Sequence, residues 1–445
     1  MIVLGSVQAA VELLENRSQI YSSRPISVIA QLVSWDWLLS LLPYNAVWRS
    51  QRRFFVEHFS KTMIQEYHPI MLQECHRLLV GCLADPSRGR QHLRNLPSAV
   101  IARIAYGVQG ATSIKEKVAL AEGGMASIRQ MLVPGAFLAE LIPALRYIPA
   151  WLPGGSARKF AQTHKKAVIR MRDQPFYEVV DAINAGSSVP SIASSLVMHM
   201  QEENDGRELT ADQEATARDV VGAAYIGAVD TTSGLMEFLI LAIAMHPGVQ
   251  SKAQTELDRV VGHSRLPGFR DLEDLTYLKA IVMETVRWLP VAPLGAPRLL
   301  ERDDVYKGYH IPKGTVVSYN AWAMLRDPQD YEDPEKFVPE RFIGVNGMID
   351  PLIRDPISIA FGFGRRACPG VSFALSLTTI FAALTLHAFD IEAGVDEVGD
   401  PVVLKAEQTG EGISCPTTFP RSIKPRSART EGLVHDLIPG CDEGI

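Results

Sequence analysis

The chain has 445 residues, of which 47% are hydrophobic and 21% are charged, a composition typical of a globular protein. Its net charge of -6 argues against a nucleic-acid-binding protein, because such proteins are usually basic. The five cysteines are scattered and form no Cys-x-x-Cys pair, so neither a disulfide framework nor a structural zinc site is predicted.

The first two thirds of the chain predict one helix after another. Apolar residues recur at helical spacing in segments that end at Gly or Pro. Thr210 with Gln213 resembles a capping box at the start of the longest segment. The expected helices cover residues 7–17, 60–86, 157–186, 210–248 and 274–290.

Two apolar stretches could be mistaken for membrane spans. Residues 368–389 lack any charged side chain but contain serines, threonines and a histidine, so we expect a buried helix. Residues 131–153 are interrupted by four prolines, Glu140 and Arg146, so we expect a surface that dips into a lipid interface instead of a span.

The composition changes after Val291, where Pro, Gly and β-branched residues become frequent. Residues 304–320 predict a hairpin, with breaks at Gly308 and at Pro312 to Gly314. After Pro425 the chain is polar, and we expect it to be loosely ordered. The predicted fold class is therefore mainly α with small β-sheets (α+β).

The segment "FGFGRRACPG", residues 361–370, has the features of a site for a metal-bound thiolate. Cys368 is followed by Pro369, which suits the first turn of a helix, and the positive end of that helix would stabilise a thiolate. Glycines would let the backbone approach a flat group, and Arg366 offers a fork to a carboxylate. The alternative is a buried structural cysteine at a loop–helix junction.

These residues satisfy the pattern Phe-x-x-Gly-x-Arg-x-Cys-x-Gly through Phe361, Gly364, Arg366, Cys368 and Gly370. Here the sequence resembles the cytochrome P450 family of haem-thiolate monooxygenases. The resemblance implies haem b with Cys368 as its axial ligand, which favours O–O cleavage. It also implies a triangular, helix-rich domain that encloses the haem.

The resemblance covers residues 1–427 as a single domain, followed by a polar tail at 428–445. Residues 1–14 look like the second strand and the following helix of microsomal members. We therefore expect the chain to lack the membrane anchor and the first strand that those members carry.

Three further residues match a structural network of the family. Glu284 and Arg287 lie three apart on one helix face, and Arg341 lies in the later Pro-Glu-Arg-Phe segment. The resemblance assigns them to a buried network behind the haem. The alternative for the first two is a surface ion pair of little energetic value.

Asp230 and Thr231 lie inside an apolar helical run, where polar side chains are costly unless they are used. In the family, an acid–alcohol pair at this place assists proton delivery during oxygen activation. Without such a role, the Thr231 hydroxyl would bond back to the helix and Asp230 would face solvent.

The remaining cofactor contacts come from the resemblance. Trp48 and Arg52 form a Trp-x-x-x-Arg motif that contacts a haem propionate in the family, and Arg298 lies where another propionate contact is common. Regions expected to line a mostly apolar pocket are 21–42, 225–231, 291–296 and 412–414.

The predicted function is that of a monooxygenase that inserts one oxygen atom into a hydrophobic small molecule, such as a terpenoid, a polyketide, a steroid-like compound or an aromatic xenobiotic. The sequence resembles fungal microsomal members of the family, many of which serve secondary metabolism. The alternatives are a reductase-independent isomerase or dehydratase of the same fold, and a truncated, non-catalytic haem-binding remnant.

The family resemblance also implies partners and a location. Electrons would come from NADPH through cytochrome P450 reductase, with cytochrome b5 as a further candidate donor. Arg49, Arg53 and Lys61 could form a basic patch for such a donor, or simply a solvated helix face. The expected location is the cytosolic face of the endoplasmic reticulum membrane. A cytoplasmic or peripheral location is the alternative for a chain without an anchor.

Overall fold

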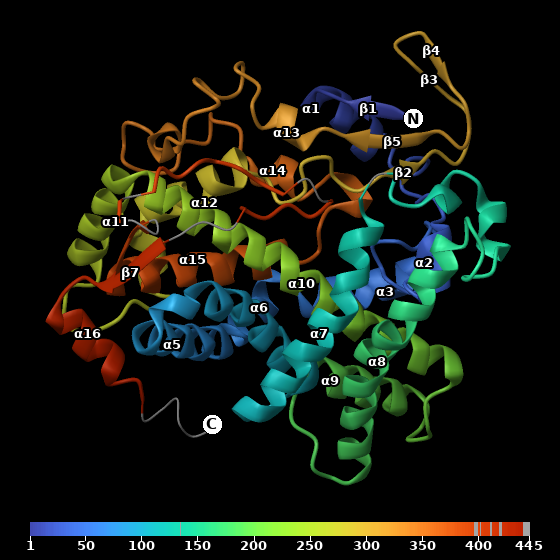
Figure 1. The fold of residues 1–445 in the computed structure, drawn as a ribbon, viewed down its shortest axis with the longest axis horizontal. Helices are drawn as coiled ribbons and strands as arrows, with labels where there is room; N and C mark the ends of the chain where they lie inside the picture. Colours follow the sequence, from blue (N-terminus) through green and yellow to red (C-terminus); the bar gives the residue numbers. More distant parts are fainter. Residues whose placement is uncertain (134, 396–398, 401, 410–411, 418–420, 439–445) are drawn as a thin grey trace.

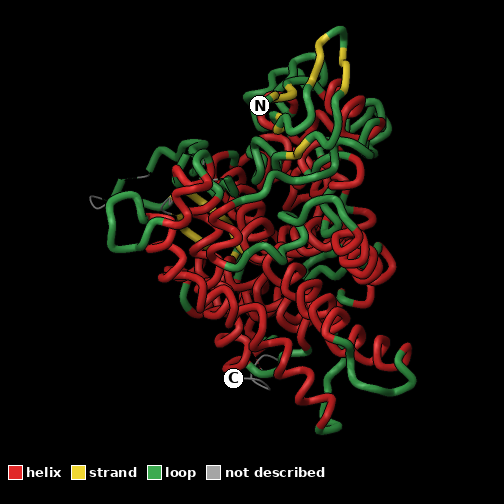
Figure 2. The backbone as a smooth tube through the Cα atoms, turned by 90° about the vertical axis from the view of Figure 1, so that its right-hand side faces the viewer, coloured by secondary structure: helices red, strands yellow, loops and turns green. Residues whose placement is uncertain are grey.

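A computed structural model describes the chain except for residues 134, 396–398, 401, 410–411, 418–420 and 439–445. Helices make up most of the described part, and the strands form small, separate sheets (Figure 2). The predicted fold class, mainly α with small β-sheets, is confirmed.

The first half of the chain is almost entirely helical (Figure 1). Its helices are α1 (Val7–Ala10), η1 (Val11–Asn16), α2 (Val28–Val33), α3 (Ala46–His58), α4 (Lys61–Glu66), α5 (His68–Ala84), η2 (Pro86–Arg88), α6 (Gly89–Tyr106), α7 (Ala111–Met131), η3 (Leu138–Glu140), η4 (Pro143–Tyr147), α8 (Ser156–Asn184) and α9 (Ile192–Glu203).

The second half combines long helices with short turns. Its helices are α10 (Ala211–Met245), α11 (Pro247–Val260), η5 (Asp271–Asp274), α12 (Thr276–Trp288), α13 (Ala321–Met324), η6 (Pro339–Phe342), α14 (Ile357–Ala360), η7 (Gly364–Arg366), α15 (Val371–Ala388) and α16 (Ala428–His435).

The long helix α10 is the centre of the core. Its start is fixed by the predicted capping box, in which the Thr210 hydroxyl accepts from the Gln213 N–H. Helices α3, α6, α8, α12 and α15 all pack against it, so α10 is buried on nearly every side. A helix buried all round can be apolar all round, and α10 is nearly so.

Helices α10 and α15 are long and apolar enough to cross a membrane by length and composition, but both are mostly buried inside the protein. The prediction of a buried helix in residues 368–389 is thus confirmed, with α15 covering Val371–Ala388.

The segment predicted as one helix at 60–86 is two helices, α4 and α5. Pro69 has no N–H to donate to the carbonyl of Gln65, so α4 ends at Glu66 and α5 begins at His68. Helix α12 ends at Trp288, just before Pro290, as predicted.

The strands are β1 (Ile2–Leu4), β2 (Arg298–Leu299), β3 (Asp304–Tyr306), β4 (Tyr309–Ile311), β5 (Val316–Tyr319), β6 (Phe389–Ala393) and β7 (Arg421–Pro425). Strand β5 pairs in parallel with β1 and antiparallel with β2, while β6 pairs with β7. The β3–β4 hairpin turns at Lys307 and Gly308, both with positive φ. The predicted hairpin therefore ends at Ile311, and residues 316–319 belong to a different sheet.

The expectation of loose order after Pro425 is wrong for the described residues. Ser427 caps α16 through a capping box with Thr430, and Val434 is buried beneath the helix. Helix α16 packs against α5 and α15. A single apolar side chain at helical spacing is enough to dock this short, mostly polar helix, and the sequence pattern gave that position little weight.

Candidate functional site

The loop before α15 is closed by backbone hydrogen bonds. The Cys368 N–H donates to the Phe361 carbonyl over 2.7 Å. Gly362 has φ of +81°, a conformation that side chains rarely adopt. Phe361 therefore contributes through its backbone, and the loop holds Cys368 at a defined place ahead of the helix.

Gly364 lies against η1. Its φ is +53°, and a Cβ added there would approach the Leu14 carbonyl oxygen to 2.3 Å. Any other residue would push the cysteine loop away from the N-terminal segment. Gly364 thus couples residues far apart in the chain, and this is a packing role in addition to the pattern that predicted it.

Helix α15 begins at Val371, with Gly370 as its N-cap. The expectation that Pro369 lies in the first helical turn is wrong, because Pro369 comes just before the cap. The Gly370 N–H nevertheless bonds the Cys368 sulfur. Burial raises the pKa of the Cys368 thiol, while the Gly370 N–H and the nearby Arg52 act to lower it.

The Cys368 side chain is accessible although it lies deep in the protein. This combination describes a thiol that faces an interior opening. Cys75 and Cys82, in contrast, are fully buried, and burial raises the pKa of both thiols.

Helix α3 docks onto the cysteine loop through both residues of its predicted motif. The Arg52 Nη2 donates to the Ala367 carbonyl over 2.6 Å. The Arg366 guanidinium lies over the Trp48 ring, 4.3 Å from its centroid. The structure thereby brings Trp48, Arg52, Arg366 and Cys368 together from opposite ends of the chain.

Among the described residues, the side-chain hydrogen bonds of Arg298 and Arg366 go only to carbonyl oxygens. Arg298 is buried, donates to the Leu14 and Phe363 carbonyls, and leaves its Nε without a partner. Arg366 clamps the 22–42 loop by donating to the carbonyls of Ser22, Leu39 and Leu42.

Arg24 is a residue that the sequence analysis missed. It is buried in the loop expected to line the pocket and donates to the Ser40, Ala296 and Pro297 carbonyls. No local motif marks it, and its role depends on neighbours more than 250 residues away. The only signal was a single basic residue in the mostly apolar 21–42 segment.

Arg24, Arg52, Arg298 and Arg366 form a cluster of four guanidinium groups. Among the described residues, none of the four makes an ion pair with Asp or Glu. Burial and the neighbouring arginines lower the pKa of Arg366 to about 8, an effect that the more distant Glu301 only partly offsets. Burial and Arg298 likewise lower the pKa of Arg24 to about 9. The surroundings thus disfavour the charged forms of these arginines, and a dicarboxylate placed beside them would be bound strongly.

The cluster and the thiol together fit haem. The accessible Cys368 sulfur suits an axial ligand, and the guanidinium groups suit two propionates. The most direct sign of a missing anionic ligand is the Arg298 Nε, which has no hydrogen-bond partner among the described residues, because a buried donor without a partner is rare.

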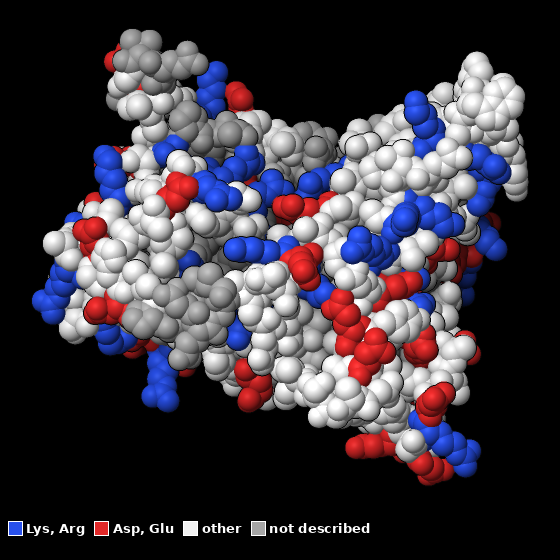
Figure 3. Space-filling view, turned by 60° about the horizontal axis from the view of Figure 1, so that its bottom comes forward, with Lys and Arg blue, Asp and Glu red and all other residues white. Residues whose placement is uncertain are grey.

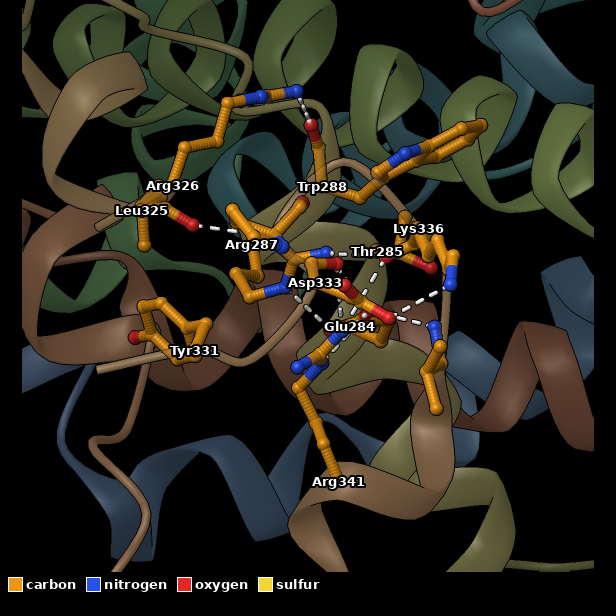
Figure 4. Close-up of polar contacts among 12 residues, drawn as sticks. Glu284, Thr285, Arg287, Trp288, Leu325, Arg326, Tyr331, Asp333, Lys336 and Arg341 are labelled. Carbon is orange, nitrogen blue, oxygen red and sulfur yellow. Dashed lines mark hydrogen bonds and ion pairs between the residues drawn. The ribbon is translucent and has the colours of Figure 1, made fainter. Parts of the chain in front are cut away.

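Glu284, Arg287 and Arg341 form a network in which Glu284 and Arg287 are completely buried and Arg341 is partly buried (Figure 4). Arg287 makes two hydrogen bonds to the Glu284 carboxylate, at 2.6 and 2.8 Å, and Arg341 reaches the same carboxylate at 3.2 Å. Arg287 also donates to the carbonyls of Leu325, Pro334 and Lys336, so it holds the 325–338 segment against α12. The surface alternative for Glu284 and Arg287 is wrong, since both are completely buried.

The middle of α10 is buried except at Gly227 and Thr231, which lie one turn apart. The Thr231 hydroxyl donates to the Gly227 carbonyl over 2.7 Å. Asp230 does not face solvent. It is buried and accepts two hydrogen bonds of 2.7 Å from Arg129 on α7.

The Asp230–Arg129 pair belongs to a larger charge network. Arg94 on α6 lies 3.8 Å from both Asp230 and Glu237, the latter two helical turns farther along α10. Glu237 in turn binds Arg90 at 2.8 Å. The network compensates the two carboxylates in the mostly apolar part of α10 that follows Val220.

The buried network around Glu284 yields a stability prediction. Glu284→Gln should leave two arginines without a counter-charge and lower the free energy of unfolding by about 3–5 kcal/mol. Urea unfolding of the haem-loaded protein measures this change. Asp333→Asn, which breaks the exposed pair with Lys336 in the same segment, should cost no more than about 1 kcal/mol. Equal effects of the two substitutions would contradict the assignment.

Comparison with known proteins agrees with this site. The family model for cytochrome P450 matches residues 1–406. The chain is 35% identical over 436 residues to cytochrome P450 monooxygenase COX2 from Coprinopsis cinerea, covering 98% of this chain and 82% of that protein.

Two further fungal relatives are similar over comparable lengths. Cytochrome P450 monooxygenase ple1 from Rhodocybe pseudopiperita is 37% identical and covers 98% of this chain and 82% of its own. Tryptamine 4-monooxygenase from Psilocybe cyanescens is 35% identical and covers 96% and 84%. With an intact cysteine loop and relatives of this similarity, the chain belongs to the cytochrome P450 monooxygenase family.

Proposed function

We propose that the protein is a haem-thiolate monooxygenase that inserts one oxygen atom into a hydrophobic small molecule, with electrons supplied from NADPH through a reductase. The observation that carries this proposal is the accessible Cys368 sulfur beside the Gly370 N–H and Arg52, next to arginines that have no acidic partner in the described part of the chain.

The cofactor would be haem b. Cys368 would be the axial ligand, and Arg52, Arg298 and Arg366 would hold the propionates, with Arg24 as a fourth contributor. Haem iron with a thiolate ligand supplies the activation of dioxygen. The protein's part is to keep the sulfur as a thiolate and to fix the orientation of the ring.

Asp230 and Thr231 would move protons into the site. The Thr231 hydroxyl is accessible beside Gly227, so it can exchange its helix hydrogen bond for one to a water or a substrate. Asp230 is its chain neighbour, and Arg129 keeps the carboxylate in place. Retention of this pair favours the monooxygenase over an isomerase or dehydratase.

The donor would dock on the face of α3 and α4. Arg49, Arg53 and Lys61 are all exposed there, and α3 contacts the cysteine loop through Arg52. A basic patch close to the thiolate suits an acidic donor such as NADPH-cytochrome P450 reductase or cytochrome b5. A solvated helix face is the alternative. The face of the molecule drawn in Figure 3 carries both kinds of charge, with lysine and arginine mostly across its upper middle and aspartate and glutamate mostly at lower right.

The substrate class follows from mostly apolar pocket regions and from the relatives. One relative is named for the oxidation of tryptamine, an aromatic amine. Terpenoids, polyketides, steroid-like compounds and aromatic xenobiotics complete the set to screen by substrate-induced difference spectra, and secondary metabolism is the proposed setting.

A membrane-facing location would follow from the 131–153 segment. Its side chains include Leu141, 76% exposed, and Trp151, 81% exposed. Such large exposed apolar side chains suit insertion into a lipid interface, here proposed as the cytosolic face of the endoplasmic reticulum.

The axial-ligand assignment predicts the effect of Cys368→Ala. The variant should lose the long-wavelength Soret band that thiolate ligation gives to the reduced, carbon-monoxide-bound protein. Cys415→Ala should keep the band and controls for the loss of a cysteine. Normal turnover by Cys368→Ala would refute the assignment, and a wild-type protein without the band would support the non-catalytic remnant.

The proton-delivery role predicts the effect of Thr231→Ala. The variant should consume NADPH at a near-normal rate but release most of the electrons as peroxide, because the hydroxyl that directs protons is lost. The ratio of product to NADPH measures this coupling. Thr231→Ser keeps a hydroxyl and should restore it, and unchanged coupling in Thr231→Ala would show that the role is wrong.

The missed residue Arg24 yields a prediction for cofactor retention. Arg24→Gln should transfer haem to apomyoglobin roughly ten- to a hundredfold faster, because a hydrogen bond to a charged group contributes about 1.5–3 kcal/mol. Arg24→Lys should recover part of the retention. Arg17→Gln, which removes a half-exposed arginine nearby, should have no effect. Unchanged haem transfer in Arg24→Gln would exclude Arg24 from the propionate site.

A further inference from the structure

A groove with a volume of about 620 Å³ lies on the surface between α2 and α8, far in sequence from the cysteine loop. Helices α2 and α8 pack against each other along this groove. Its lining residues are Leu32, Arg158, Ala161, Gln162, Lys165, Lys166, Ile169 and Arg170.

The rim of the groove is strongly basic. Four of its lining side chains are cationic, all four are exposed, and no lining residue is acidic. Among the described residues, no Asp or Glu forms an ion pair with any of the four. Arg158 donates to the Arg146 carbonyl and Arg170 donates to the Gln174 side chain, so both remain available as cations.

The floor of the groove is apolar. Leu32 comes from α2, while Ala161 and Ile169 come from α8. Lys165 and Lys166 follow Ala161 by one helical turn, so one face of α8 carries both the apolar floor and the basic rim. A ligand that fills this groove must therefore combine an apolar body with an anionic group.

The groove adjoins the exposed apolar segment. Arg146 of η4 donates to the Gln31 side chain on α2, and Arg158 of α8 donates back to the Arg146 carbonyl. These bonds tie the two walls of the groove to η4. Figure 1 shows this segment, in teal, beside α2. The neighbouring side chains Leu141 and Trp151 are among the most exposed apolar groups of the protein.

We propose that the α2–α8 groove binds an anionic phospholipid, with its phosphate and carboxylate on Lys165, Lys166, Arg158 and Arg170 and the upper part of an acyl chain on the Leu32–Ile169 floor. Lysine and arginine stems cover apolar surface while their charges reach headgroups. This site would give the membrane contact of the 131–153 segment a preference for negatively charged lipid, and it does not depend on the oxygenase chemistry.

A phospholipid fits the groove better than the other candidates. Free phosphate would leave the apolar floor unused. An acidic peptide would need free backbone partners, whereas the lining residues all belong to helices α2 and α8. The combination of a basic rim and an adjoining exposed apolar segment is typical of a surface that lies on anionic membranes.

The test measures co-sedimentation of the haem-loaded chain with two kinds of vesicle, pure phosphatidylcholine and phosphatidylcholine mixed equally with phosphatidylserine. The wild type should bind the mixed vesicles more tightly. The triple variant Lys165→Gln, Lys166→Gln and Arg170→Gln should lose roughly a hundredfold in binding to the mixed vesicles, as about 1 kcal/mol per basic residue predicts. Its binding to pure phosphatidylcholine should not change.

A matched control removes the same charge elsewhere. The control variant removes three positive charges from surface residues outside the groove, through Lys279→Gln, Lys405→Gln and Lys424→Gln. Equal losses in the two triple variants would overturn the proposal, because the preference would then reflect net charge alone. A groove variant that binds mixed vesicles like the wild type would overturn it too.

A second measurement separates the groove from the 131–153 segment. Short-chain phosphatidylserine below its micelle concentration should bind the wild type and not the groove variant or Ile169→Asp. Inorganic phosphate should not compete at equal concentration, and full competition would overturn the choice of a lipid. A double variant with Leu141→Ser and Trp151→Ser tests the segment by itself. If this variant loses binding to vesicles but still binds the short-chain lipid, the groove is intact and only the membrane contact of the segment has failed.

Discussion

Four arginine side chains, none of which has an acidic partner among the described residues, surround the approach to Cys368, and the geometry around the cysteine loop depends on them. Each guanidinium is held by backbone carbonyls from segments that are distant in sequence: Arg366 holds the 22–42 loop, and Arg298 holds the cysteine loop against η1. The carbonyls orient the cations without neutralising them. The structure thus assembles a rigid, uncompensated positive charge next to a thiol, which is the electrostatic complement of a metal-bearing dicarboxylate.

In two other buried networks of the molecule, the charged side chains have partners of opposite charge. In the Glu284 network, both carboxylate oxygens and the Arg287 nitrogens have partners, so the network joins α12 to the following segment through one carboxylate that faces two arginines. In α10, Asp230 and Glu237 are each matched by arginines from α6 or α7. Compensated networks of this kind fix structure. The contrast between matched charges in the core and the arginines beside Cys368 supports the proposed site independently of the relatives.

Much of the site could be predicted because its residues are local in sequence. The cysteine loop, the Glu284–Arg287 pair and the Trp48–Arg52 pair each lie within one loop or one helical turn, where spacing determines geometry. The relatives show the family, while the roles of these residues remain predictions. Helix boundaries at Pro290 and at the Thr210 cap were predictable for the same reason.

The features that the sequence could not show depend on contacts between residues that are far apart in the chain. Arg129 reaches Asp230 from 101 residues away, and Arg24 reaches the Ala296 carbonyl from 272 residues away. The docking of α16 depends on one side chain, Val434, meeting a surface built by other helices. The place of Pro369 just before the cap follows from the start of α15 at Val371, which no local pattern fixed. None of these follows from periodicity or local propensity.

The central claim, that the arginine cluster exists to hold two carboxylates beside the Cys368 thiolate, can be tested by comparing ferric protoporphyrin IX with its dimethyl ester. The ester keeps the ring and the iron but lacks both negative charges. The account predicts that the apoprotein binds the diacid at least about tenfold more tightly, since hydrogen bonds to charged groups contribute about 1.5–3 kcal/mol each. Equal affinity for the two porphyrins would contradict it.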